Sequence, residues 1–232
     1  TYTQVNGITS AVCDFFDSEV SREIVVFGRE YSLAVLISGL ILTVCVAMVV
    51  IGGIQRISRV SEMVVPFMAV IYVAACLVIL GTHWRQIPQA FSLILESAFG
   101  LRAIGGGALG SVLVAMQKGI ARGIFSNEAG LGSAPIAAAA AQTKEPARQG
   151  LVSMTGTFID TIIICTMTGL SIVVTGSYNV GLDGVAVTTR AFQMGLPIPE
   201  QASAFILMCC LIFFAFTTII GWNYYGEKCL EY

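Results

Sequence analysis

Apolar residues run along the chain in stretches long enough to cross a membrane. The hydrocarbon core of a bilayer is about 30 Å thick, so a spanning helix needs roughly 20 apolar residues. Residues 31–54, 63–81, 151–175 and 202–223 meet this requirement with at most one charged residue in each stretch. Residues 1–16 fit the outer end of a further span, whose beginning we expect to precede the chain, so that the chain is an internal part of a longer protein.

A sixth region, residues 105–141, is long enough to span but is interrupted by polar residues near its middle. A polar, glycine-containing break at membrane depth must be buried in protein or line a cavity, because each unpaired backbone group facing lipid costs several kcal/mol. We therefore predict an all-α, polytopic membrane protein: a single transmembrane region with about six spans, one of them discontinuous.

The connectors between the spans alternate in length and charge. The short connectors 55–62 and 142–149 are rich in Lys and Arg, which favours the cytoplasmic side. The longer connectors 14–30, 83–102 and 177–201 are then outside. Two short amphipathic helices are predicted within the outer connectors, at 87–99 and 185–194, from apolar residues that recur every three to four positions.

Composition supports a membrane protein and excludes several functions. Hydrophobic residues make up 56% of the chain and charged residues 11%, against about 25% charged residues in soluble domains. A net charge of −2 with no basic patch argues against a nucleic-acid partner. The seven cysteines lie mostly in apolar runs and read as packing residues. The sequence offers no nucleophile–base pair, metal cluster or triad, so we predict neither an enzyme nor an organic cofactor.

The break in the sixth region is the main candidate binding site. A discontinuous helix leaves free N–H groups that suit a carboxylate and free carbonyls that suit a cation. Ser126 and Asn127 are good N-cap residues for the second half, and Gly130 permits a close approach of the backbone. The alternative is an ordinary loop between two helices.

Two acidic residues lie within predicted spans. Glu128, at the break, is either a proton or ion site or a structural cap of the second half-helix. Asp160 is either functional, as intramembrane acids often are, or a simple acceptor of hydrogen bonds from nearby threonines or a neighbouring helix. We assign both a structural or coupling role.

Hydroxyl, amide and indole groups provide a second set of candidates. Thr217 and Thr218 have oxygens that suit Na⁺, and Trp222 shares a helix face with Thr218. The alternative is that both threonines bond back to their own helix and that Trp222 lies at the membrane interface. Gln4 and Asn6, in the first partial span, contact either a substrate or a partner helix.

Four blocks of sequence resemble the alanine or glycine:cation symporter family, the sodium:alanine symporters. The longest is Ala121-Arg122-Gly123-Ile124-Phe125-Ser126-Asn127-Glu128-Ala129-Gly130-Leu131-Gly132-Ser133-Ala134-Pro135-Ile136. The others lie, in order along the chain, at residues 51–57, 148–161 and 214–227.

The resemblance implies a leucine-transporter-like fold of two inverted five-helix repeats, of which this chain supplies about core helices 3 to 8 and lacks the first. It implies Na⁺-coupled symport of alanine or glycine by alternating access in a bacterial or archaeal plasma membrane; a proton-coupled or other-solute carrier of the same fold is the alternative. The partners would be a small neutral amino acid, sodium ion and membrane lipid. The implied substrate-binding residues are Phe125, Ser126, Asn127, Gly130, Thr218, Trp222, Gln4 and Asn6, and the implied sodium ligands are Thr217 and Thr218.

Overall fold

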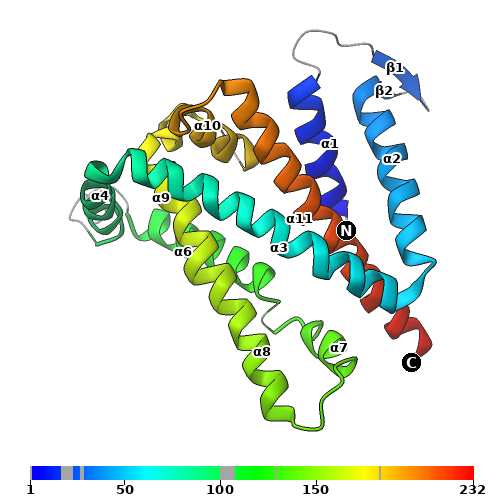
Figure 1. Cartoon of the computed structure of the whole chain (residues 1–232). Helices are drawn as coiled ribbons and strands as arrows, with labels where there is room; N and C mark the ends of the chain where they lie inside the picture. Colours follow the sequence, from blue (N-terminus) through cyan, green and yellow to red (C-terminus); the bar gives the residue numbers. More distant parts are fainter. Residues whose placement is uncertain (1, 17–22, 27–28, 100–107, 129, 183) are drawn as a thin grey trace. The chain divides into compact units, whose positions relative to one another are not determined.

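The computed structural model describes residues 2–16, 23–26, 29–99, 108–128, 130–182 and 184–232 (Figure 1). Side chains are described in these ranges except at positions 14, 23–31, 98–99, 108–112, 114–115, 122 and 125. Four helical stretches of the described chain are long and apolar enough to cross a membrane: 33–50, 53–82, 146–175 and 200–231. The prediction of a helical, multi-span membrane protein is confirmed.

Contacts divide the chain into two compact units. The first comprises residues 1–78 and 177–232, and the second residues 79–176. The main helices of the first unit are α1 (Tyr2–Phe16), α2 (Leu33–Val50), α10 (Val185–Gly195), α11 (Glu200–Glu231) and most of α3 (Gly53–Thr82). The short helix η3 (Ser177–Val180) precedes α10.

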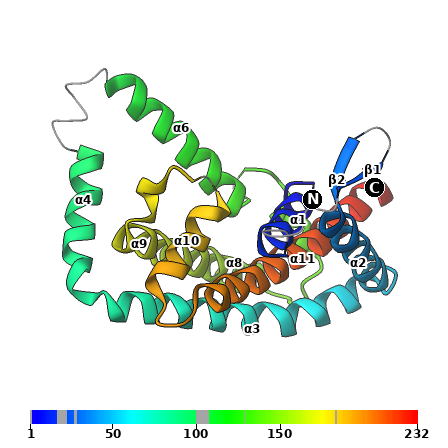
Figure 2. The same cartoon turned by 90° about the horizontal axis from the view of Figure 1, so that it is seen from above.

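The core of the first unit lies where α1, α2 and α11 pack together (Figures 1 and 2). Ile8 from α1, Leu42 from α2, and Ala215 and Ile219 from α11 are buried in one apolar cluster. Helix α11 also packs against α10, which makes it the central helix of this unit.

A β-hairpin, which the sequence analysis did not predict, precedes α2 in this otherwise helical fold. Strands β1 (Glu23–Val26) and β2 (Arg29–Ser32) pair antiparallel, with Glu23 opposite Ser32 and Val26 opposite Arg29. Ser32 then caps α2, because its Oγ accepts a hydrogen bond from the N–H of Ala34 at 3.2 Å. The β-branched run at 24–26 is the sequence signal that favours strand here.

The predicted connector 55–62 is wrong: these residues belong to α3, and the chain turns at 51–52 instead. Gly53 has φ +68°, a left-handed conformation that costs glycine little. Arg56 stabilises the turn by donating from Nη1 to the carbonyl of Met48 at 2.8 Å. Charged residues such as Arg56 are helical here, and Pro66 lies inside α3.

Aromatic packing fixes α10 within the first unit. Phe192 is fully buried, and its ring stacks on Tyr72 of α3 with centroids 5.5 Å apart. Tyr72 in turn meets Phe214 of α11 edge to face at 6.2 Å. One face of α10 is thereby anchored, which leaves its opposite face to line a cavity described below.

The second unit carries the predicted break. Its elements are η1 (Trp84–Gln86), α4 (Ile87–Phe99), α6 (Ala108–Ser126), α7 (Ala134–Ala139), α8 (Pro146–Phe158), η2 (Ile159–Cys165) and α9 (Thr166–Thr175). The segment η2 is π-helical and joins α8 and α9 into one continuous span. Helix α4 packs against α9. The amphipathic helices predicted at 87–99 and 185–194 are confirmed as α4 and α10.

Candidate functional site

A break separates α6 from α7. Helix α6 ends at Ser126 and α7 begins at Ala134, so the described residues between them carry backbone groups outside regular helix. Glu128, Gly130 and Gly132 have positive φ, at 51°, 77° and 76°. Left-handed backbone is costly for residues other than glycine, so Glu128 is held in a strained conformation. The second half is shorter than expected, since α7 has only 6 residues.

Two residue pairs join the end of α6 to the π-helical segment η2. Ser126 Oγ donates to Asp160 Oδ2 at 2.5 Å. Asn127 and Thr161 bond to each other twice: Asn127 Nδ2 donates to Thr161 Oγ1 at 2.9 Å, and Thr161 Oγ1 donates to Asn127 Oδ1 at 3.1 Å. Adjacent residues on one element thus pair with adjacent residues on the other. A π-helical turn often marks a functional position, and here it presents both partners to the break.

The predicted capping of α7 by Ser126 and Asn127 is wrong, because both side chains bond to η2 instead. Ser133 is the N-cap residue of α7, without a side-chain hydrogen bond to the helix. Its Oγ donates to Glu128 Oε2 at 2.8 Å. Glu128 therefore holds the break together from within rather than capping the helix. The side chain of Phe125 lies outside the described residues.

Thr217, Thr218 and Trp222 lie on α11, in the other unit. Thr217 Oγ1 donates to the carbonyls of Phe213 and Phe214, both at 3.0 Å, and Thr218 Oγ1 donates to that of Phe214 at 2.9 Å. Both hydroxyl protons are thus bonded to the helix backbone, as the structural alternative predicts. Each hydroxyl oxygen keeps lone-pair capacity for a further partner.

One aromatic residue, Trp222, and two amides, Gln4 and Asn6, complete the predicted set in the first unit. Trp222 meets Tyr225 edge to face with ring centroids 5.6 Å apart. Gln4 accepts a hydrogen bond from Thr3 at 3.0 Å. Asn6 lines a cavity between α1, α10 and α11, whereas Thr217, Thr218 and Trp222 are not among its lining residues. The predicted site residues therefore form two groups, one in each unit.

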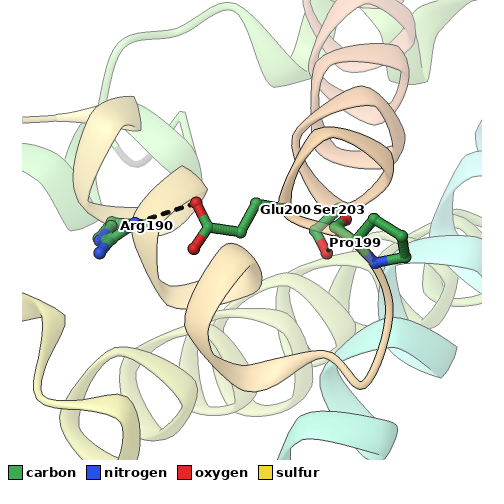
Figure 3. Close-up of polar contacts among 4 residues, drawn as sticks. All are labelled: Arg190, Pro199, Glu200 and Ser203. Carbon is green, nitrogen blue, oxygen red and sulfur yellow. Dashed lines mark hydrogen bonds and ion pairs between the residues drawn. The ribbon is translucent and has the colours of Figure 1, made fainter.

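Sequence reasoning missed the charged pair at this cavity. Arg190 of α10 and Glu200, the first residue of α11, form an ion pair with Nη1 and Oε2 3.5 Å apart (Figure 3). Glu200 is well placed because the first turn of α11 is firmly closed: the carbonyl of Pro199 accepts from both the N–H and the Oγ of buried Ser203, at 3.1 and 3.3 Å. Opposite charges ten residues apart in an outer connector were the available signal.

Comparison with known proteins identifies the family. The sequence profile described as "Sodium:alanine symporter family" matches residues 2–232. The chain is 50% identical to an uncharacterized transporter of Haemophilus influenzae over 100% of its own length and 48% of that protein. It is 47% identical to the sodium/alanine symporter AgcS of Methanococcus maripaludis, over 88% of the chain and 45% of AgcS. It is 36% identical to a sodium/proton-dependent alanine carrier protein of Bacillus sp. strain PS3, over 89% of the chain and 48% of that protein.

The chain thus spans about half the length of the curated relatives that it matches. The match nevertheless covers nearly every residue of the chain, including the broken span and the apolar helices on either side of it. The chain belongs to the sodium:alanine symporter family.

Proposed function

We propose that the full-length protein containing this chain carries a small neutral amino acid, alanine or glycine, into the cell together with Na⁺ by alternating access. Family membership and the similarity to a named sodium/alanine symporter support this proposal. The single observation that carries it is the break between α6 and α7, which interrupts an otherwise apolar region with non-helical backbone and hydrogen-bonded polar side chains.

The break supplies chemistry that an amino acid needs. Non-helical backbone at membrane depth is tolerated only where protein or a water-filled cavity surrounds it. Discontinuous helices bind substrates and ions in transporters of inverted-repeat architecture, and we propose the leucine-transporter-like version of that fold. The residues proposed to contact the substrate are Phe125, Ser126, Asn127 and Gly130 from the break, with Thr218, Trp222, Gln4 and Asn6 from the other unit.

We assign Asp160 and Glu128 to holding the break in shape. Asp160 accepts from Ser126, and Glu128 accepts from Ser133, so each acid fixes a serine at one end of the non-helical segment. An acid within a span is costly unless it has such a partner. Their role in coupling would follow from this geometry, because movement of either acid also moves the substrate-binding backbone.

Na⁺ is the proposed coupling ion, with Thr217 and Thr218 as ligands. Na⁺ is a hard cation that favours oxygen ligands, and both hydroxyl protons already point to backbone carbonyls. Their lone pairs therefore remain as acceptors for a cation. The second candidate is coupling to protons, which the name of the Bacillus sp. relative favours.

Uptake of radiolabelled alanine into proteoliposomes tests the proposal. The full-length protein should accumulate alanine when an inward Na⁺ gradient is imposed, and replacing external Na⁺ with K⁺ should abolish accumulation. An inward proton gradient without Na⁺ separates the two coupling ions. Unlabelled glycine should compete. Absence of uptake under every gradient would refute symport of these amino acids.

A further inference from the structure

The cavity in the first unit is built from one face of each of three helices. Its volume is about 910 Å³. The lining residues of α1 lie on one face of that helix, because they recur every three to four positions. The lining residues of α10 and of the first half of α11 likewise lie on one face of each helix. The lining residues used below are Arg190, Thr189 and Gln193 from α10, and Glu200, Leu207 and Met208 from α11.

We propose that this cavity is a second binding site, separate from the site proposed at the break, and that it takes a zwitterionic α-amino acid with an apolar side chain. Arg190 and Glu200 place a cation and an anion 3.5 Å apart at the cavity (Figure 3). A zwitterion carries the complementary pair of charges. The guanidinium of Arg190 binds the ligand carboxylate through two parallel hydrogen bonds, and the carboxylate of Glu200 accepts from the ligand ammonium.

The ion pair is easily replaced by a ligand. The side chains of Arg190 and Glu200 are 38% and 67% exposed, and an ion pair so exposed contributes little to stability. Inserting a zwitterion between them exchanges one long contact for charge-assisted hydrogen bonds on both sides. The backbone that carries them stays in place, because Phe192 anchors α10 and Pro199 closes the first turn of α11.

The remaining lining selects the side chain. Leu207 and Met208 are buried apolar residues of α11, and Thr189 and Gln193 are neutral polar residues of α10. No further charged residue lines the described part of the cavity, so a charged ligand side chain would lack a partner. Because Leu207 and Met208 offer apolar atoms to the side chain of the ligand, the cavity favours neutral amino acids with a larger apolar side chain than alanine, such as leucine.

Equilibrium binding of radiolabelled leucine to the purified full-length protein, in Na⁺-free buffer, tests this site. We expect saturable binding that Arg190→Gln and Glu200→Gln each weaken at least about tenfold. Arg190→Lys should weaken leucine binding by an intermediate amount, because lysine keeps the positive charge but cannot form the two parallel hydrogen bonds of a guanidinium. The matched control is Lys228→Gln, which removes one partner of the exposed Lys228–Glu231 pair on the same helix and should leave binding unchanged.

Leucine analogues test the zwitterion directly. Leucinamide lacks the carboxylate and 4-methylpentanoate lacks the ammonium, so each should compete at least about tenfold more weakly than leucine. Equal competition by either analogue, or unchanged binding in both charge variants, would overturn the proposal. Absence of leucine binding to a folded, monodisperse protein would overturn it as well.

The proposal does not rest on Na⁺-coupled transport, and its failure is distinguishable from failure of that function. Trp222→Ala should leave leucine binding unchanged, because Trp222 does not line this cavity. If Trp222→Ala abolishes leucine binding while Arg190→Gln does not, leucine occupies the proposed transport site and the second site is refuted. Alanine uptake, measured separately, reports on transport alone.

Discussion

Asp160→Ala should reduce alanine uptake by about tenfold. The substitution removes the acceptor that holds Ser126 at the end of α6. A hydrogen bond to a charged group contributes roughly 1.5–3 kcal/mol. Because Ser126 is exposed and Asp160 only half-buried in this chain, the lower end applies, at about 1.5 kcal/mol. Each 1.4 kcal/mol corresponds to about a factor of ten, which sets the expected loss in kcat/KM.

A double-mutant cycle separates this bond from other effects of Asp160. Ser126→Ala alone and Asp160→Ala alone should each break the bond, so the double variant should lose little more than the larger single loss. Asp160→Asn keeps an amide oxygen as acceptor and should retain most activity. The activity of all four variants is measured as the initial rate of alanine uptake into proteoliposomes, normalised to the amount of folded protein. If the two single losses multiply in the double variant, the bond does not couple these residues and the argument fails.

Three further predictions follow from other contacts. Gly130→Ala should cost about 1–2 kcal/mol and impair uptake, because φ is +77° there, while Gly119→Ala within α6 should be neutral or stabilising in thermal unfolding. Phe192→Ala should destabilise the protein by about 3–5 kcal/mol, since the ring is fully buried against Tyr72, whereas Phe205→Ala, at an exposed position, should shift the unfolding temperature far less. Thr218→Ala should raise the Na⁺ concentration needed for half-maximal uptake severalfold, and Thr218→Ser, which keeps the hydroxyl, should restore it; equal effects of both would exclude the oxygen as a ligand.

The helices were predictable from the sequence because burial in lipid is a property of each stretch by itself. A run of apolar residues such as 33–50 needs no partner to favour a helix in a bilayer, since the helix satisfies its own backbone. The periodicity of α4 and α10 was readable for a related reason: each has one apolar face.

The partners of polar side chains were not predictable, because they depend on which elements meet. Ser126 has the right chemistry to cap a helix, yet its hydroxyl bonds to Asp160, 34 residues away. The local sequence favours a nearby backbone N–H as the partner of this hydroxyl. It contains no information about a carboxylate that another span brings close. The alternative raised for Asp160, acceptance from a neighbouring helix, needed the fold to identify the donor.

The hairpin and the extent of α3 were missed for a different reason. A strand of four residues, such as β1, gives a weak signal beside apolar runs of twenty. Charged residues near Arg56 indicate where the chain leaves the membrane, but leaving the membrane does not end a helix, so a loop does not follow from their charge.

The π-helical segment sets the rotational phase of everything that follows it in the chain. A π turn closes its hydrogen bond one residue later than an α turn, and one residue of an α-helix corresponds to about 100° of rotation. The side of α9 that packs on α4 is therefore aligned by η2, not by the apolar pattern of α8. Deleting one residue within 159–165 should let α8 and α9 wind as a uniform helix and turn that side of α9 out of its contact with α4. The segment η2 therefore sets the rotation of α9 about its own axis relative to the polar pairs at the break.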